Sequence, residues 1–392
     1  MIILDQPYVS EFLKQTIVEE NIPVIWTKEV SMFYLHEKTR LVSEEEAIRK
    51  YKEQPFLIYT NSENAIEWVN KNLSFSELPH NIELFKDKFK FRELTRKLLP
   101  NFFYREIALS DLHKLNYSEL PKRFVLKPVV GFFSMGVYIV ENEAQLNKAI
   151  AGIKNEIESI NNLYPKEVLD IDRFIIEEYL EGEEFAFDAF YDKTGEPSVI
   201  GIMKHLFASS DDVGDRVYYT SRSIIEEYVP IFEQFLIQLG KLVDLKNYPL
   251  HVEVRINKNR ELLPIEVNPL RTGGWCTSAD LAHHAFGYNP IAYMLQQKKP
   301  DWNEILADKD DKRYSIVILT NTTGIAPADL ESVDYNGILR RFGNPLELRK
   351  SDFNTHPHWG FLFTETSPEH WQEIEDILVD DLKQYASGTS KK

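Results

Sequence analysis

The chain has 392 residues, of which 43% are hydrophobic and 12% aromatic, so it can bury a large core and form two or three domains. Its formal net charge of -17 argues against an extended surface for nucleic acid or an anionic membrane, because such surfaces need clustered lysine and arginine. A single cysteine, Cys276, excludes an intrachain disulfide and a zinc site built from several cysteines.

The first 85 residues alternate short apolar runs with polar, helix-like segments. The runs lie at 2–4, 23–26 and 56–59, and the helix-like segments at about 8–20 and 43–53. This alternation predicts a small parallel α/β sheet. No glycine-rich turn follows the first run, which disfavours a dinucleotide site. The N-terminus also lacks a signal-peptide pattern, and no apolar run is long enough to span a membrane, so we expect a soluble, cytoplasmic protein.

Residues 86–182 place two lysines around a glycine loop. Lys88 opens an amphipathic helical run, and Lys127 stands at the end of a strand that leads into a loop between Gly131 and Gly136. The glycines let this loop bend tightly, so that its N–H groups and the Ser134 hydroxyl can cradle phosphate beside the Lys127 cation. An ordinary β-hairpin with a solvated lysine fits the same residues.

A second motif lies between residues 172 and 185, where an acidic chain reversal at Gly182 separates two apolar strands. Such a crossover between lobes suits an adenine, because main-chain groups bond its edge while apolar side chains cover its faces. A solvated acidic turn explains the same composition equally well.

Residues 251–274 read as two strands joined by a polar turn. Alternate side chains of a strand share a face, so Glu253 projects with Arg255 and Glu266 projects with Asn268. Two carboxylates and a carboxamide on an otherwise apolar hairpin are costly unless a cation compensates them, and a divalent ion with oxygen ligands does so. The alternative is a surface hairpin with solvated acids.

The remaining chain carries no recognisable chemistry. A strand-like run at 314–319 and a helix over 368–385 predict a small α/β appendage at 301–385, which either completes the lower lobe or contacts another subunit, so that a homo-oligomer stays open. We expect residues 386–392 to form a disordered tail. In the loop at 208–220, Arg216 either binds a substrate carboxylate or lies on a plain exposed loop.

The order and spacing of these motifs resemble the ATP-grasp superfamily of ATP-dependent carboxylate–amine ligases, from about residue 86 to residue 274. Lys88 comes first, Lys127 precedes the glycine loop, Glu-Glu-Tyr-Leu-Glu-Gly-Glu-Glu follows, and Glu253 stands thirteen residues before Glu266. The resemblance implies an α/β chain of three parts: an N-terminal parallel domain at 1–85, a two-lobed ATP-grasp domain at 86–300 with a mobile subdomain at about 120–182, and the appendage.

The resemblance also implies a role for individual residues. The implied ATP contacts are Lys88, Lys127, Gly131, Ser134, Gly136, Glu177, Tyr179, Leu180, Glu184 and Lys204. Among them, Glu177, Tyr179 and Leu180 line the adenine and Glu184 holds the ribose. Glu253, Glu266 and Asn268 are the implied ligands of one or two Mg²⁺ ions, for which Mn²⁺ can substitute. Lys127, Arg255 and Arg271 are the implied catalytic cations. Arg271 departs from some relatives by lying five residues after Glu266, one position further along.

The implied reaction joins a small carboxylate, such as an amino acid, to an amine through an acyl phosphate, with release of ADP and phosphate. The expected partners are therefore these two small molecules, without nucleic acid or membrane. Carboxylase and peptide-modifying chemistry stay open within the superfamily. A nucleotide-binding regulatory protein without turnover is a further alternative, which the intact set of acids disfavours.

Overall fold

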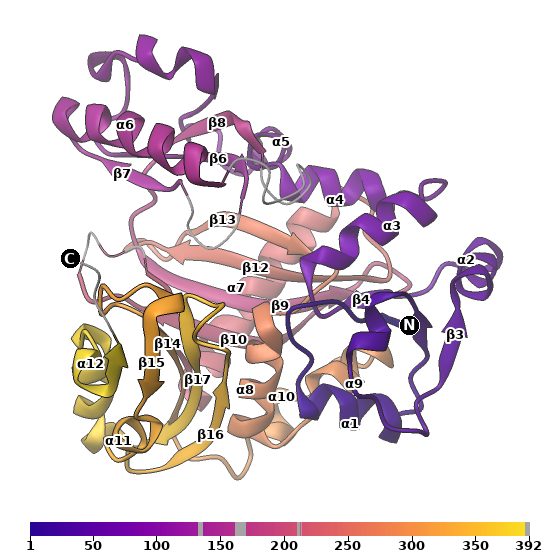
Figure 1. Cartoon of the computed structure of the whole chain (residues 1–392). Coiled ribbons are helices and arrows are strands. Elements are labelled where there is room, and N and C mark those ends of the chain that lie inside the picture. The colour runs from indigo at the N-terminus through magenta and orange to yellow at the C-terminus, as the bar shows by residue number, and fades with distance from the viewer. Residues whose placement is uncertain (132–135, 161–169, 210–211, 213, 389–392) are drawn as a thin grey trace.

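The N-terminal residues form the parallel α/β unit that the sequence predicts (Figure 1). The computed structural model describes residues 1–131, 136–160, 170–209, 212 and 214–388. The first strands are β1 (Ile2–Ile3), β2 (Val24–Trp26), β3 (Leu41–Ser43) and β4 (Tyr59–Thr60), in the order β3-β2-β1-β4. The intervening helices are α1 (Glu11–Glu19), α2 (Glu44–Glu53) and α3 (Ile66–Asn72). The described pairs in this sheet are parallel, which confirms the prediction.

A small antiparallel lobe follows, and Figure 1 shows it above the rest of the molecule. Its strands are β5 (Tyr104–Ala108), β6 (Phe124–Val130), β7 (Tyr138–Val140) and β8 (Asp170–Glu178), in the order β5-β8-β6-β7. Helix α6 (Glu143–Ile160) packs Leu146 and Ile153 against Phe124 and Phe174 of this sheet. Helices α4 (Leu78–Lys86) and α5 (Lys88–Thr95) connect the lobe to the N-terminal unit.

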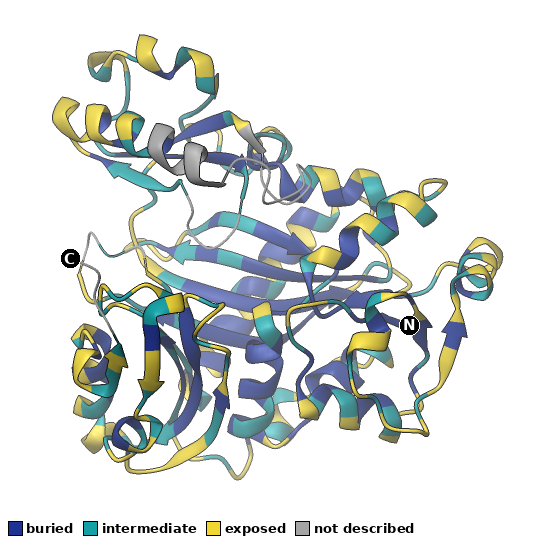
Figure 2. Cartoon of the chain, in the orientation of Figure 1, coloured by how far each residue is buried: buried dark blue, intermediate teal, exposed yellow. Residues whose placement is uncertain are grey.

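An eight-stranded sheet forms the centre of the molecule, and Figure 2 shows that its middle strands are buried. Its strands run in the order β13-β12-β9-β10-β11-β14-β17-β16, with bounds β9 (Glu183–Tyr191), β10 (Pro197–Leu206), β11 (Val217–Thr220), β12 (Tyr248–Ile256), β13 (Leu262–Pro269), β14 (Arg313–Thr320), β16 (Pro345–Lys350) and β17 (His358–Thr366). Alternation along β9 sends Phe185 and Phe187 toward Phe232 of α7 (Arg222–Gly240). Ala186 clusters instead with Leu281 of α8 (Thr277–Phe286).

The C-terminal strands extend this central sheet, because β14 pairs antiparallel with β11. This arrangement matches one of the two placements expected for the appendage, the completion of the lower lobe. The other elements of this half are α9 (Pro290–Leu295), α10 (Trp302–Ile305), β15 (Leu330–Val333), α11 (Tyr335–Leu339), α12 (Gln372–Val379) and β18 (Ala386–Gly388).

Two sequence expectations near the C-terminus need correction. The helix expected over 368–385 consists of a 3-10 turn at Pro368–His370, α12, and a second turn at Lys383–Tyr385, because Leu382 adopts a left-handed backbone with φ 57°. Residues 386–388, expected in a disordered tail, form β18 and pair with β15. The last four residues lie outside the described part of the chain.

Gly182 marks the passage from the small lobe to the central sheet. Its φ is +138°, and a Cβ added there would lie 2.3 Å from the carbonyl oxygen of Ile256. Only glycine combines this backbone conformation with so close an approach to β12. The chain reversal that the sequence placed at Gly182 therefore depends on this residue.

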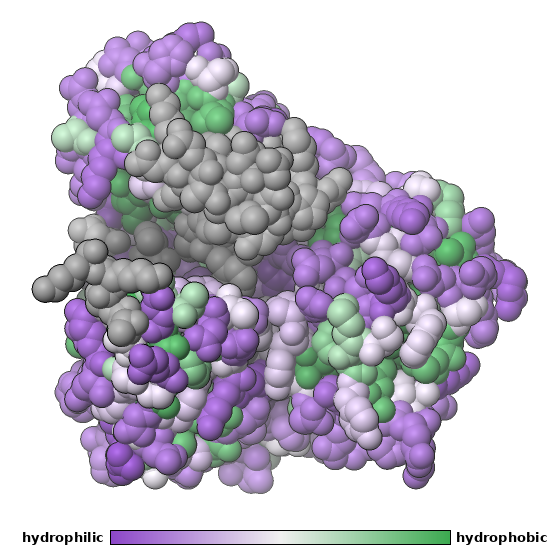
Figure 3. Space-filling view, in the orientation of Figure 1, coloured by the Kyte–Doolittle hydropathy of each residue, from purple (hydrophilic) through white to green (hydrophobic). Residues whose placement is uncertain are grey.

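The exterior agrees with the acidic composition. Hydrophilic side chains predominate on the face shown in Figure 3, and apolar side chains appear only in separate patches. None of the helices in the described part of the chain is both long and apolar enough to cross a membrane.

Candidate active site

The hairpin of β12 and β13 brings the predicted metal ligands together. Glu253 stands directly opposite Glu266, and His251 stands opposite Asn268. The Asn268 Nδ2 donates a hydrogen bond to Glu266 Oε1 at 3.1 Å. Val252, Val254 and Val267 are buried on the other face, as the alternation predicts. The two carboxylates and the amide thus share one patch of the sheet.

The two facing glutamates differ in how far nearby cations balance their negative charge. Burial and the Glu266 carboxylate raise the pKa of Glu253 well above its usual value. Burial would also raise the pKa of Glu266, but the ammonium of Lys88, 2.9 Å from its Oε2, outweighs this and lowers the pKa to about 2. Glu253 is therefore a carboxylate without a full counter-charge, which a divalent cation between the two acids would supply.

The donor set fits a cation that prefers oxygen, since it contributes two carboxylates and an amide. No cluster of three or more His, Cys, Asp and Glu suited to a metal is present among the described residues. Any ion held here would thus depend on Glu253, Glu266 and Asn268, with water or phosphate oxygens completing its shell.

Lys88, predicted to contact phosphate, lies beside Glu266. It is the first residue of α5, whose N-cap Asp87 accepts a hydrogen bond from the Lys90 N–H. Besides Glu266, the Lys88 Nζ contacts the carbonyl oxygen of Gly131, at 3.4 Å. Lys88 therefore links the hairpin of β12 and β13 to the start of the glycine loop. Gly136 ends the loop with φ 69°, and Ser134 lies outside the described residues.

Lys127, on β6, forms a buried ion pair with Glu177 of β8, with 2.8 Å between Nζ and Oε2. Burial lowers the pKa of Lys127 in spite of this pair. The Arg92 guanidinium, which sequence reasoning missed, grips the same carboxylate at 2.7 and 3.1 Å. The side chain of Glu177, predicted to line the adenine, is thus fully engaged by two cations.

Arg92 also donates hydrogen bonds to the carbonyl oxygens of Pro264 and Ile265, at 2.6 and 3.2 Å. It therefore links α5, the small lobe and β13 through one buried side chain. A signal for it exists in the sequence: Arg92 lies four residues after Lys88, and residues at this spacing share a helix face.

Of the residues predicted for adenine and ribose, Glu184, Leu180 and Tyr179 gather around Arg255. Glu184 accepts hydrogen bonds from the Arg255 Nε and is 2.9 Å from the His205 Nδ1. The Leu180 carbonyl accepts a hydrogen bond from Arg255 Nη1 at 2.6 Å, and the guanidinium carbon lies 4.8 Å from the centre of the Tyr179 ring. Arg255, predicted as a catalytic cation, is thereby held at the hinge.

The structure does not bring Lys204 to this face. Its Nζ lies 2.5 Å from Glu183 Oε1 and 5.6 Å from the centre of the Phe185 ring, on the side of the sheet that α7 covers. His205, the next residue, points to Glu184 instead. Because side chains alternate along a strand, only one of these neighbours can face the site.

Arg271 approaches the hairpin from the segment after β13. Its guanidinium pairs with Glu63 of the N-terminal unit at 2.7 Å. Burial would lower the pKa of Arg271, but Glu63, together with the more distant Glu253 and Glu266, raises it. Leu270, with φ 62°, turns the chain just before Arg271, where the spacing departs from that of some relatives. Nothing in the sequence singled out Glu63.

The segment before β11 contains a buried acid, Asp215, and an arginine, Arg216, that bonds to the C-terminal part of the chain. Burial raises the pKa of Asp215, whose Oδ1 accepts a hydrogen bond from the Tyr218 hydroxyl at 2.7 Å. Arg216, considered for a substrate carboxylate, donates instead to the carbonyl oxygens of Ile377 and Asp380, at 3.3 and 2.7 Å. Its guanidinium closes the C-terminal end of α12.

Residues 120–279 match the family described as ATP-grasp domain. Among solved structures, an L-amino acid ligase from Bacillus licheniformis has a TM-score of 0.62 at 18% identity, covering 100% of this chain and 98% of that one. An N5-carboxyaminoimidazole ribonucleotide synthetase from Thermotoga maritima has a TM-score of 0.60 at 16% identity, covering 100% and 99%.

A biotin carboxylase from Campylobacter jejuni, in complex with an ATP analogue, has a TM-score of 0.58 at 14% identity, covering 93% of this chain and 87% of that one. No curated protein matches the sequence. At these identities the structural matches show the fold. The family match covers residues 120–279, so this part of the chain carries an ATP-grasp domain, in agreement with the resemblance read from the motifs.

Proposed function

We propose that this protein is an ATP-dependent carboxylate–amine ligase that forms an amide bond through an acyl phosphate. One observation supports the proposal above all: Glu253 and Glu266 face each other on the hairpin while Lys88 bridges from Glu266 to the glycine loop. This arrangement suits a nucleotide triphosphate bound between two lobes, with its phosphates over the hairpin.

Glu253, Glu266 and Asn268 would hold Mg²⁺, which when bound supplies positive charge next to the β- and γ-phosphates. Lys88 would turn from Glu266 toward phosphate, since the ion takes over the compensation of that carboxylate. Lys127 would contact phosphate while Glu177, itself held by Arg92, keeps the lysine side chain in place. The protein's contribution is thus to position charges that oppose the negative charge of the moving phosphoryl group.

The proposed reaction has two transfers. A carboxylate oxygen of the substrate attacks the γ-phosphorus, and the bond from that phosphorus to the β-phosphate oxygen breaks, which releases ADP. The nitrogen of an amine then attacks the acyl carbon, phosphate leaves with the carbon–oxygen bond electrons, and the amine loses a proton. Arg271 pairs with Glu63 of the N-terminal unit, and its guanidinium is suited to bind the carboxylate or the acyl phosphate.

A small carboxylate such as an amino acid is the proposed first substrate, which the L-amino acid ligase match supports by covering both chains almost completely. Carboxylation of an amine is the second candidate, because ribonucleotide synthetases match over the same length with a similar TM-score. Both reactions would use the site described above and an amine acceptor, and they differ in the carboxylate that is activated, an amino acid in the first and bicarbonate in the second.

The decisive experiment measures phosphate release from ATP with Mg²⁺ and a panel of amino acids, alone and in pairs. A parallel set contains bicarbonate with amines. Release that requires a particular pair, with the coupled product seen by mass spectrometry, supports the ligase. Release that requires bicarbonate selects carboxylation. Nucleotide binding without release under any condition would overturn both and favour a regulatory protein.

A further inference from the structure

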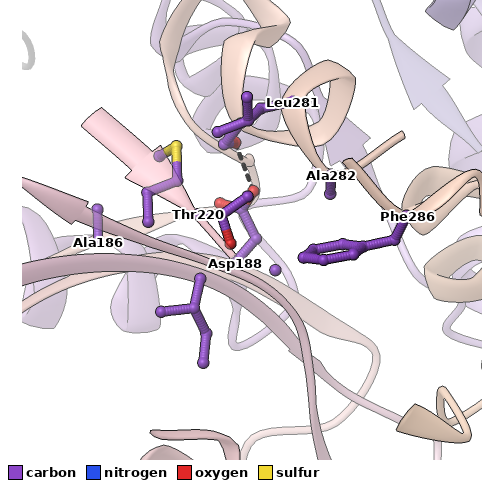
Figure 4. A pocket seen from close by; sticks show the side chains of 10 residues that line it. Ala186, Asp188, Thr220, Leu281, Ala282 and Phe286 are labelled. Atoms are coloured by element: carbon purple, nitrogen blue, oxygen red, sulfur yellow. Dashed lines mark hydrogen bonds between the residues drawn. The ribbon is translucent and has the colours of Figure 1, made fainter. Parts of the chain in front are cut away.

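Asp188, near the middle of β9, is a buried carboxylate that collects three hydrogen bonds. It accepts from the His251 Nδ1 at 2.7 Å, from the Gly273 N–H at 3.0 Å, and from the Ser278 hydroxyl. Only 2% of its surface is exposed. Figure 4 shows Asp188 together with Thr220, Leu281 and Ala282, which line the same gap.

Protein donors alone hold this carboxylate. The gap beside it, between β9, β10 and α8, is too narrow for a water molecule. Burying a carboxylate without such donors costs free energy, and the three bonds offset this cost. An acid in this setting fixes the orientation of whatever bonds to it.

Strand register places Asp188 level with Asn268 across the sheet, and two residues along the strands from the level of Glu253 and Glu266. Asp188 pairs with His251 across β9 and β12, and His251 pairs with Asn268 across β12 and β13. Two residues along these strands, the next row contains Glu253 opposite Glu266. The His251 Nε2 lies 3.9 Å from Glu253 Oε1. His251 therefore stands between the buried acid and the uncompensated one.

The bond to Asp188 determines which nitrogen of His251 carries the proton. Because the carboxylate only accepts, Nδ1 must be the protonated nitrogen, and Nε2 is the nitrogen directed at Glu253. A carboxylate behind a histidine in this way sets the tautomer and the ring orientation.

The same carboxylate anchors the segment that follows Arg271. A Cβ added to Gly273 would lie 2.6 Å from the Ser278 Oγ, so that glycine permits the close contact. The Gly273 N–H donates both to Asp188 and to Ser278 Oγ, the latter at 2.7 Å. Asp188 thus holds two parts of the candidate site at once, the metal hairpin through His251 and the Arg271 segment through Gly273.

We propose that Asp188 is a positioning residue which, through His251 and Gly273, sets the geometry of Glu253 relative to Arg271. The inference rests on the proposed function, since it assigns Glu253 to an Mg²⁺ ion. It goes further in naming Asp188, His251 and Ser278, for which neither the sequence motifs nor the family match gave a role.

The substitution Asp188→Asn tests it. An amide has one accepting oxygen. In the place of Oδ1 this oxygen still accepts from His251 and Gly273, but the NH₂ group then faces Ser278, whose bond to the carboxylate is lost together with the negative charge behind His251. We expect ¹⁵N histidine spectra of the metal-free protein to show His251 protonated at Nδ1 in the wild type and in the variant. His251→Gln assigns the signal.

The second readout is the Mg²⁺ concentration that half-saturates ATP binding, followed by calorimetry. Loss of a residue that orients a metal ligand typically costs about 10- to 100-fold in metal affinity, and we expect Asp188→Asn to fall in this range. The matched control is Asp280→Asn, a buried aspartate on α8 that bonds to Arg349 and Ser10 instead. It should leave both the His251 signal and the Mg²⁺ dependence as in the wild type.

The outcomes separate the two proposals. Absence of Mg²⁺-dependent ATP binding in the wild type contradicts the proposed function. Normal wild-type binding, together with an unchanged Mg²⁺ requirement in Asp188→Asn, overturns the role of Asp188. A wild-type His251 protonated at Nε2 also overturns it, and that result needs no variant to fold. If Asp188→Asn does not fold, Ser278→Ala removes one donor only and should raise the Mg²⁺ requirement in the same direction by a smaller factor; no rise refutes the inference.

Discussion

The small lobe and the central hairpin each set a lysine against a glutamate, but they balance charge differently. In the small lobe, Glu177 meets both Lys127 and Arg92, which lower its pKa to about 2 although burial opposes them. On the hairpin, Lys88 compensates Glu266 only. Among the described residues no lysine or arginine forms an ion pair with Glu253, whose side chain is 30% exposed. Side chains of the protein thus balance the charge of Glu177, whereas the charge of Glu253 leaves room for a bound cation.

Breaking the complete arrangement should produce the largest effect. Arg92→Met leaves Glu177 with one cation and removes two bonds to the backbone of β13. We expect a loss of about 3–5 kcal/mol in the free energy of unfolding, because a partner of a buried ion pair is removed and the carbonyl oxygens of Pro264 and Ile265 lose their donor. Urea unfolding followed by circular dichroism measures it. In Arg96→Met, which removes an exposed arginine of the same region, stability should stay near that of the wild type.

On the hairpin, substitution should affect turnover more than folding. Glu266→Gln removes a proposed metal ligand, and we expect phosphate release to fall by about 100- to 1,000-fold, as for loss of a group that stabilises transition-state charge. Glu261→Gln, in the turn of the same hairpin, is the matched control. Retention of turnover in Glu266→Gln, with the coupled product still formed, would remove Glu266 from the mechanism.

Gly182, which joins the small lobe to the central sheet, has a backbone conformation that other residues adopt only with strain. Gly182→Ala forces an alanine to φ +138° and brings its Cβ against the Ile256 carbonyl. Strain of this kind costs roughly 1–3 kcal/mol, and thermal unfolding should show the loss. Gly274→Ala is the control, since a Cβ at Gly274 meets no atom within 4 Å. Equal stability of the two variants would show that the hinge relaxes freely.

Removal of the uncompensated acid should stabilise the protein when metal is absent. Because folding raises the pKa of Glu253, its carboxylate destabilises the protein increasingly as the pH rises above the unfolded pKa, by about 1.4 kcal/mol for each pKa unit of the shift once the pH exceeds the folded pKa. We therefore expect Glu253→Gln to unfold at higher urea concentration than the wild type in EDTA at neutral pH. Added Mg²⁺ with ATP should stabilise the wild type and not the variant. A less stable Glu253→Gln in EDTA would contradict the charge imbalance.

A last test concerns the acid unfolding of the small lobe. Since folding lowers the pKa of Glu177 from 4.5 to about 2, its ion pairs stabilise the protein fully above pH 4.5 and are lost as the pH falls toward 2. The wild type should therefore be more stable than Glu177→Gln at neutral pH, and the difference should shrink through this window. Urea unfolding at several pH values measures it. A constant difference would show that the charge of Glu177 is not responsible.

Local pattern was sufficient for a large part of the fold and the site. Alternation of apolar runs and helices gave the parallel N-terminal sheet, and the period of two along residues 251–268 placed Glu253, Glu266 and Asn268 on one face. The sequence also predicted the chain reversal at Gly182, because the positive φ of a glycine is a local property of the chain. These features depend on neighbours in the sequence, so the sequence by itself determined them.

Tertiary structure alone decided which charges meet. Arg92 and Glu177 are 85 residues apart, Glu63 and Arg271 are 208 apart, and Asp188 and His251 are 63 apart. Lys204 faces α7 because β10 shifts register against β9 between Val199 and Gly201, and one extra residue exchanges the faces of all that follow. Pairing between distant strands sets both the register and the partner of each buried charge, and no local pattern carries that information.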